Sequence, residues 1–151
     1  MTDINNLIAE YGLLLDEDRL EEWAELFTED ANYRVVTREN KKLNLPVAVI
    51  WCDNKKMIHD RIHSYRHVNE YNLHYDRHII SHPRILEVSS TEWHVQTGYS
   101  LFQTNLEGQS ILFSVGHYDF VIVKDNDLLK IKFLEVVSDT GSFETLLATP
   151  I

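Results

Sequence analysis

The second half of the chain alternates apolar and polar side chains over three unusually long stretches. They cover residues 93–101, 111–123 and 129–137, and the turn-forming segments Asn105–Gly108 and Lys124–Asp127 separate them. A period of two is typical of β-strands that bury one face, and such breaks predict antiparallel hairpins. Strands well beyond the usual five or six residues must twist and coil. The sequence therefore predicts a curved sheet that wraps around a hollow.

Three segments ahead of this sheet have the apolar spacing of amphipathic helices. They cover residues 4–15, 18–27 and 53–71, and Asp18 with Glu21 has the spacing of a capping box at the start of the second. The first two are too short to persist alone, so they need a sheet to cover. The buried faces predicted for the three helices consist of Ile4, Leu7, Ile8, Tyr11, Leu14 and Leu15, of Leu20, Trp23, Ala24 and Phe27, and of Met57, Ile58, Arg61, Ile62, Tyr65 and Val68.

The segments between these helices predict a first strand, a loop and a short strand. Asn32–Thr37 alternates like a strand, Arg38–Pro46 is polar and ends in proline, and Val47–Trp51 is apolar. Helices followed by strands indicate the α+β class. A length of 151 residues fits one domain with a substantial core, so we expect a single domain over residues 1–151.

The charge balance limits which partners the chain can have. Lys and Arg total 14 against 24 Asp and Glu, which gives a net charge of -10. Such a surface repels nucleic acid and anionic lipid, and it suits a basic surface on another protein. The start of the chain lacks a signal-peptide pattern and no apolar run is long enough to span a bilayer, so we expect a cytoplasmic protein. The single cysteine, Cys52, excludes an internal disulfide.

Six segments together resemble one known family over nearly the whole chain, from about Ile4 to Pro150. They are YRV (33–35), TRENKKLNLP (37–46), VIW (49–51), MIHDRI (57–62), YDRHIISHPRI (75–85) and ATPI (148–151). This pattern resembles the small (β) subunits of multicomponent aromatic-ring-hydroxylating dioxygenases. Within that family it is most similar to the small subunits of terephthalate dioxygenase and salicylate 5-hydroxylase, which act on aromatic acids.

The resemblance implies a fold and a role. The fold is the cone of nuclear transport factor 2 and the SnoaL-like proteins, with three N-terminal helices packed in a strongly curved, mostly antiparallel sheet. The role is that of a non-catalytic β subunit that forms a homotrimer and holds three α subunits in an α3β3 complex. In that family the α subunit binds the aromatic substrate, the Rieske [2Fe-2S] cluster and the mononuclear Fe(II), and a reductase supplies electrons from NAD(P)H.

The cysteine count agrees with this division of labour. A Rieske cluster needs two cysteines and two histidines, and this chain has one cysteine. The chain therefore cannot hold the cluster. We expect no cofactor and no metal in it, and no catalytic residue under the family interpretation.

Histidines at a spacing of four suggest two possible clusters. His59, His63 and His67 would stack along one side of the third helix, as in some zinc sites. At about 100° per residue they lie opposite the helix's apolar stripe, so they face solvent or a partner subunit. The same spacing recurs in His74, His78 and His82. On a strand such positions lie roughly 13 Å apart, too far to share a metal, so this second set is a coincidence.

Asp60–Arg61 and Arg77–His78 are the strongest polar candidates. As an alternative to the β subunit, a free-standing dehydratase, isomerase or cyclase could use Asp60, His78 and Tyr33 as acid and base groups at the mouth of the cone. A small-molecule binding module is a third possibility. The structural interpretation is an arginine–carboxylate network that fixes the third helix to the sheet or to a neighbouring subunit. The structural or interface candidates are Arg61, Arg77, His59, His63 and His67.

Three polar residues interrupt apolar strand faces. His117, Asp119 and Glu135 share the odd-numbered positions with Phe113, Val121 and similar residues, and a buried carboxylate needs a partner or an opening to water. They could line a residual pocket, although a subunit interface is the commoner explanation. The apolar tail Phe143–Ile151 follows the last strand and predicts an oligomer contact.

Overall fold

The computed structural model describes residues 3–68, 73–139 and 150–151. Its helices are α1 (Ile4–Asp16), α2 (Leu20–Ala24), α3 (Arg38–Lys42) and α4 (Lys55–Val68). Its strands are β1 (Phe27–Thr37), β2 (Ile50–Cys52), β3 (His74–Ile80), β4 (Arg84–Ser89), β5 (Glu92–Asn105), β6 (Ser110–Asp125) and β7 (Leu128–Ser138). Among these residues no helix has the length and apolar character needed to cross a membrane.

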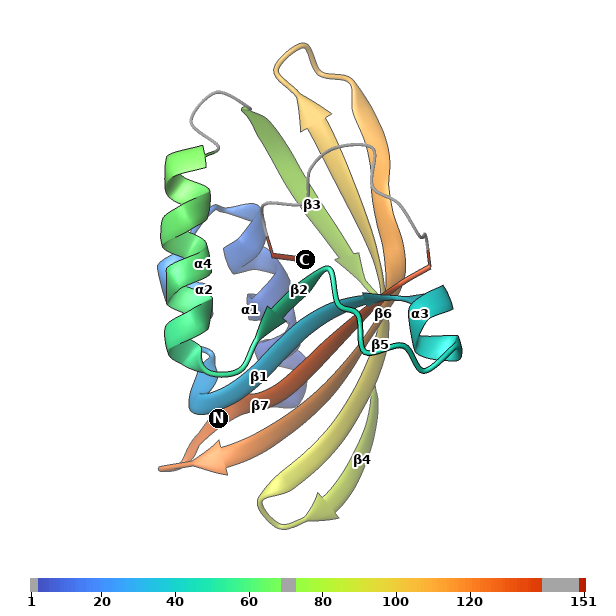
Figure 1. The fold of residues 1–151 in the computed structure, drawn as a ribbon. Coiled ribbons are helices and arrows are strands. Elements are labelled where there is room, and N and C mark those ends of the chain that lie inside the picture. The colour runs from blue at the N-terminus through green and yellow to red at the C-terminus, as the bar shows by residue number, and fades with distance from the viewer. Residues whose placement is uncertain (1–2, 69–72, 140–149) are drawn as a thin grey trace.

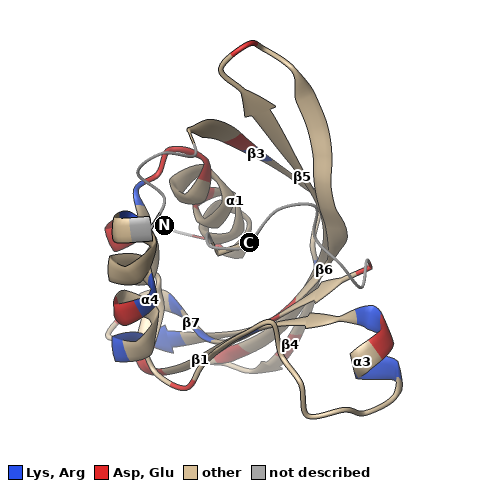
Figure 2. Cartoon of the chain, turned by 45° about the horizontal axis from the view of Figure 1, so that its top comes forward, with Lys and Arg blue, Asp and Glu red and all other residues tan. Residues whose placement is uncertain are grey.

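The strands form one curved sheet in the order β2-β1-β7-β6-β5-β3, and β4 also pairs with β5. The pairing of β1 with β7 is parallel, and the other pairings are antiparallel. Helices α1, α2 and α4 lie on the concave side of this sheet, whereas α3 lies at its opposite side (Figure 1). Figure 2 shows α1 enclosed between the sheet and α4. The predicted α+β cone is therefore confirmed in its main features.

Aromatic side chains fill the space between the helices and the concave face. The ring centre of Trp23 lies 5.0 Å from that of Phe27 and 5.6 Å from that of Tyr33, and each pair of rings packs edge to face. Tyr11 meets Tyr118 edge to face at 5.5 Å. All five side chains are at most 1 % exposed. Contacts of this geometry add about 0.5–1.5 kcal/mol each beyond the burial of area, so the interior is held by its aromatic packing.

Two β-bulges reverse which face of β6 and β7 is buried. Between Leu101 and Phe102 of β5 the register shifts because Phe113 is an extra residue on β6. Between Val121 and Ile122 of β6 it shifts because Lys132 is an extra residue on β7. Each extra residue moves the following side chains to the other face. The residues beyond the bulges that belong to the main hydrophobic core are therefore even-numbered: Tyr118, Phe120, Ile122, Leu134 and Val136. The prediction that His117, Asp119 and Glu135 share the core face was wrong, since these residues lie on the convex side. For β5 the prediction was correct, because Val95, Thr97, Tyr99 and Leu101 are buried.

Several element boundaries also differ from the prediction. Strand β1 begins at Phe27, not Asn32, because α2 ends after Ala24. The Arg38–Pro46 segment is not simply a loop, since α3 occupies its first half. Helix α2 is not capped by Asp18, which has a positive φ of 59°. Helix α4 begins two residues later than predicted, and the predicted end of that helix, 69–71, lies outside the described residues.

Candidate functional site

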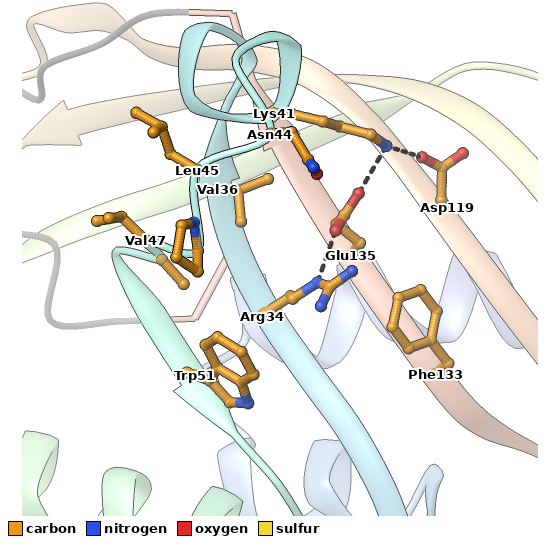
Figure 3. A pocket seen from close by; sticks show the side chains of 12 residues that line it. Arg34, Val36, Lys41, Asn44, Leu45, Val47, Trp51, Asp119, Phe133 and Glu135 are labelled. Carbon is orange, nitrogen blue, oxygen red and sulfur yellow. Dashed lines mark hydrogen bonds and ion pairs between the residues drawn. The ribbon is translucent and has the colours of Figure 1, made fainter.

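A hollow of about 770 Å³ lies on the convex side of the sheet. Its floor is the outer face of β1, β6 and β7, and its wall is the segment that joins α3 to β2 (Figure 3). Thr37 ends β1 and caps α3, because its hydroxyl accepts a hydrogen bond from the Asn40 amide at 3.2 Å. We call this the outer hollow. It is lined by Arg34, Val36, Lys41, Asn44, Leu45, Pro46, Val47, Ala48, Trp51, Asp119, Phe133 and Glu135.

A network of ion pairs crosses the floor of the outer hollow. Glu135 accepts from Arg34 Nε at 2.6 Å and from Lys41 Nζ at 2.6 Å, and its side chain is only 8 % exposed. Lys41 Nζ also lies 3.2 Å from Asp119 Oδ2, and His117 Nε2 lies 3.2 Å from the same oxygen. Burial lowers the pKa of Lys41, but hydrogen bonds to Glu135 and Asp119 outweigh this and raise it. Each charged group thus has a partner within the same chain.

Aromatic rings flank the arginine of this network. The guanidinium carbon of Arg34 lies 5.9 Å from the ring centre of Trp51 and 5.2 Å from that of Phe133. Both distances suit a cation–π contact. Trp51 is nevertheless 46 % exposed, and Leu45 and Val47 beside it are 48 % and 56 % exposed. The outer hollow therefore combines neutralised charges with an uncovered apolar rim, which suits protein contact better than acid–base chemistry.

A smaller depression of about 410 Å³ extends this surface toward β4. It shares Asp119 and Phe133 with the outer hollow, and it adds Arg84 and Leu86 from β4. Leu86 is 58 % exposed. The two depressions together make the convex side a continuous surface that none of helices α1, α2 and α4 covers (Figure 1).

On the concave side, His78 is bound to the end of α1. Its Nδ1 lies 2.6 Å from Asp16 Oδ1, its backbone N–H donates to both carboxylate oxygens at 3.0 Å, and Arg77 approaches at 3.6 Å. The side chains of Asp16 and His78 are 3 % and 1 % exposed. His78 Nε2 is buried without a hydrogen-bond partner. The sequence offered one signal for this pair, because a carboxylate at the C-terminal end of a helix is unfavourable unless something compensates it.

The three residues of the alternative catalytic set have separate surroundings. The carboxylate beside His78 is Asp16 and not Asp60, which is exposed on α4. Tyr33 is fully buried and its hydroxyl donates to the Ile151 carbonyl at 3.3 Å, while burial raises its pKa above the usual value. His74, which shares a spacing of four with His78, is on the same strand, and its Nε2 lies 3.3 Å from Asp76 Oδ1.

The histidine row on α4 faces outward, opposite buried Ile58 and Ile62 as predicted. His63 and His67 are exposed, and their Nε2 atoms lie 3.2 Å apart. His59 is directed to Glu25 at 3.5 Å. Within residues 3–68, 73–139 and 150–151, no three His, Cys, Asp or Glu side chains gather as metal ligands. An interface role for this row stays a prediction.

An arginine clamp missed by the sequence reasoning holds α4 to the turn before α2. Arg66 donates to Asp18 at 2.6 Å and to Glu21 at 2.9 Å. The hydrogen bond from Arg66 lowers the pKa of Glu21. The predicted network of this kind centred on Arg61, which is half-buried on the same helix. The positive φ at Asp18 could not be inferred from a capping-box pattern.

The end of the tail lies inside the cone. Ile151 is fully buried, and its carbonyl accepts hydrogen bonds from the hydroxyls of Tyr11 and Tyr33. For this residue the predicted oligomer contact was wrong, because the inner tyrosines already bind it. The rest of the predicted contact, residues 143–149, lies outside the described residues.

Comparison with known proteins places these features in a family. The SnoaL-like domain family matches residues 1–135. The anthranilate 1,2-dioxygenase small subunit of Burkholderia cepacia is 42 % identical over 137 residues, which cover 91 % of this chain and 85 % of that protein. A β subunit of the terminal oxygenase component of terephthalate 1,2-dioxygenase from Comamonas sp. is 29 % identical over 95 % of this chain and 93 % of its own.

A solved structure agrees with both. The crystal structure assigned to the β subunit of an aromatic-ring-hydroxylating dioxygenase from Novosphingobium aromaticivorans superposes with a TM-score of 0.88. It is 36 % identical and the match covers 98 % of this chain and 94 % of that chain. Sequence and fold therefore agree over nearly the full length of the chain. The chain belongs to the family of small (β) subunits of aromatic-ring-hydroxylating dioxygenases, which are built on the SnoaL-like domain.

Proposed function

We propose that this chain is the non-catalytic, structural subunit of a multicomponent ring-hydroxylating dioxygenase. It forms a homotrimer and holds three iron-bearing α subunits in an α3β3 complex, at distances that let electrons cross between neighbouring α subunits. The Rieske cluster and the mononuclear Fe(II) belong to the α subunit, and a reductase supplies electrons from NAD(P)H. The cytoplasm is the expected compartment.

The contrast between the two sides of the sheet is the observation that carries this proposal. On the concave side Tyr11, Trp23 and Tyr118 are 0 % exposed, and Ile151 occupies the space between α1 and β1. On the convex side the outer hollow is open and its charges are already paired. Buried concave-side aromatic residues together with an uncovered apolar rim on the outer face support a role in assembly.

The residues of the chain also fit the absence of a redox centre in it. Cys52 is buried, burial raises the pKa of its thiol, and it is the only cysteine in the sequence. A Rieske cluster requires two thiolates, so this chain lacks the ligands for it. The iron chemistry is therefore assigned to the partner.

The relatives indicate the substrate class. Anthranilate and terephthalate, named in the two similar dioxygenases, are both aromatic carboxylates. We infer that the complex containing this chain oxidises an aromatic carboxylate. Under this proposal the α subunit holds that substrate.

The Asp16–His78 pair favours a second candidate, a free-standing cavity enzyme or binding module. An imidazole oriented by a carboxylate and with Nε2 unbonded could act as a base. The same pair also explains how α1 is fixed to β3, and Ile151 binds the hydroxyls of Tyr11 and Tyr33 inside the cone. Asp60 and Tyr33 remain the other residues of this alternative.

Light scattering on the purified chain, alone and after co-expression with a candidate Rieske α subunit, distinguishes the two. The structural proposal predicts a trimer that takes up α to form a hexamer. A monomer or dimer that ignores every α subunit tested would contradict it, and would direct attention to His78 and Asp60 as catalytic candidates.

A further inference from the structure

We propose that the tip of the β5–β6 hairpin of one copy docks into the outer hollow of the next copy. The hairpin tip is defined as residues 102–112. This inference rests on the homotrimer of the proposed function and assigns the two surfaces that would build it.

The hairpin tip is a defined projection with an apolar surface. Asn105 Oδ1 accepts hydrogen bonds from the amides of Glu107 and Gln109, at 3.0 and 2.9 Å, and Gly108 supplies the positive φ that the turn requires. The tip extends beyond the helices (Figure 1). Its exposed apolar side chains are Phe102, Leu106, Ile111 and Leu112, at 36 %, 63 %, 44 % and 52 %.

The outer hollow complements this tip in polarity. Its rim exposes Leu45, Val47 and Trp51, which would be covered by the apolar side chains of a docked tip. Because Glu135 already binds Arg34 and Lys41, covering the network leaves no new charge unpaired. Covering such a network costs less than covering an unpaired charge would.

The two surfaces are also complementary in charge. The outer hollow and its extension toward β4 carry the cations Arg34, Lys41 and Arg84 against the anions Asp119 and Glu135. The hairpin tip carries one charged residue, Glu107. The hollow surface, with three cations against two anions, thus has one positive charge in excess, and the docked tip brings the one negative charge of Glu107.

The charge of the whole chain narrows the possible contacts further. Two copies of a chain with net charge -10 repel each other at most orientations. The contact proposed here brings together regions that lack the general acidic excess. It therefore allows self-association of an acidic protein.

A protomer cannot fill its own outer hollow with its own hairpin tip. Asp119, on the floor of the hollow, and Ser110, at the start of β6, are on the same strand. Nine residues of strand separate them by roughly 30 Å. The contact must therefore join different copies, and because its two halves differ it is heterologous; in the proposed trimer three such contacts form a closed ring.

Two variants test each half of the contact. Leu112→Glu alters the tip and Trp51→Glu alters the outer hollow. Because both side chains are exposed, each variant should fold normally. Its circular dichroism spectrum, and the melting temperature of its monomer, should be unchanged. We expect light scattering to give a trimer for the wild type and a monomer for each variant. Leu13→Glu, at a 50 % exposed position of α1, is the matched control and should remain a trimer.

Mixing the two variants gives the sharpest result. In the mixture an intact tip on Trp51→Glu protomers can still meet an intact hollow on Leu112→Glu protomers. Native mass spectrometry should show a one-to-one heterodimer and no closed trimer. This outcome is specific to a heterologous contact between these two surfaces.

Other outcomes overturn the proposal in distinguishable ways. If Leu112→Glu stays trimeric while Trp51→Glu does not, the hollow meets something other than the tip. If both variants remain trimers but no longer take up α, the α subunit occupies the hollow, and the proposed function stands while this inference fails. A wild-type chain that is monomeric and ignores α contradicts both.

Discussion

The two faces of the same sheet solve the problem of burial in opposite ways. The concave face is covered by the chain's own helices, and its polar groups are fixed to particular elements, as Asp16 on α1 is fixed to His78 on β3. The convex face has no helix over its centre, and its charges are balanced across neighbouring strands by Glu135, Arg34 and Lys41. The concave face thus holds the fold together, whereas the convex face leaves an apolar rim of Leu45, Val47 and Trp51 uncovered.

The largest difference between the faces should appear in two tryptophan substitutions. Trp23→Ala removes a fully buried ring and should lower the free energy of unfolding by about 3–5 kcal/mol. Trp51→Ala removes a ring that is 46 % exposed and should cost less than about 1 kcal/mol when the chain is monomeric, as in a Leu112→Glu background, where no second copy covers the ring. Urea denaturation of both variants at one protein concentration measures this. Equal losses would remove the distinction between the faces.

The next largest effect concerns the inner ion pair. Asp16→Ala leaves the imidazole and amide of His78 buried without their acceptor, and should cost about 3 kcal/mol. Denaturation at neutral pH measures the loss. A cost below that of an ordinary surface substitution would show that α1 is not held to β3 by this pair.

The corresponding outer substitution should cost less. Glu135→Gln leaves Arg34 without a carboxylate and leaves Lys41 with Asp119 alone, but Arg34 and Lys41 are 33 % and 46 % exposed, so water can solvate them. We expect a loss of about 1–2 kcal/mol in the same denaturation experiment. The double variant Glu135→Leu/Lys41→Leu serves as control and should recover part of it. A larger loss than for Asp16→Ala would reverse the comparison.

The smallest effect is a pH dependence on the concave side. Burial raises the pKa of Asp76 above its usual value of 3.8, against the opposing influence of His74 and His78 and with the support of Asp16 and Asp18. The folded state then binds its proton at a pH where the unfolded state has lost it. The free energy of unfolding therefore falls as the pH rises from about 4 through the raised pKa. Asp76→Asn should remove this part of the slope in thermal melts between pH 4 and 7, and an unchanged slope would contradict the assignment.

Much of the fold could be predicted from local patterns. The apolar stripe of α1 and the alternation of β5 were correct because each depends only on the period of its own element. The buried faces of β6 and β7 were not, because bulges near Phe113 and Lys132 depend on how neighbouring strands pair. A single extra residue then changes the face of every side chain beyond it.

The site residues were harder to predict because their partners are distant in sequence. Glu135 was recognised as needing a partner, but Arg34 lies 101 residues earlier and joins it only through the parallel pairing of β1 with β7. Likewise His78 was named, while Asp16, 62 residues away, was not. Pairing of this kind requires the topology, which local periodicity does not contain.

The most direct test of a structural, non-catalytic role is the turnover number of the assembled dioxygenase with His78→Gln in this chain. Hexamers isolated by size exclusion would be compared with wild-type hexamers at equal iron content. A structural role predicts an unchanged turnover number per hexamer, because the concave side then only maintains the fold. A fall of about 10²-fold or more in intact hexamers, the size expected for loss of a general acid or base, would contradict it.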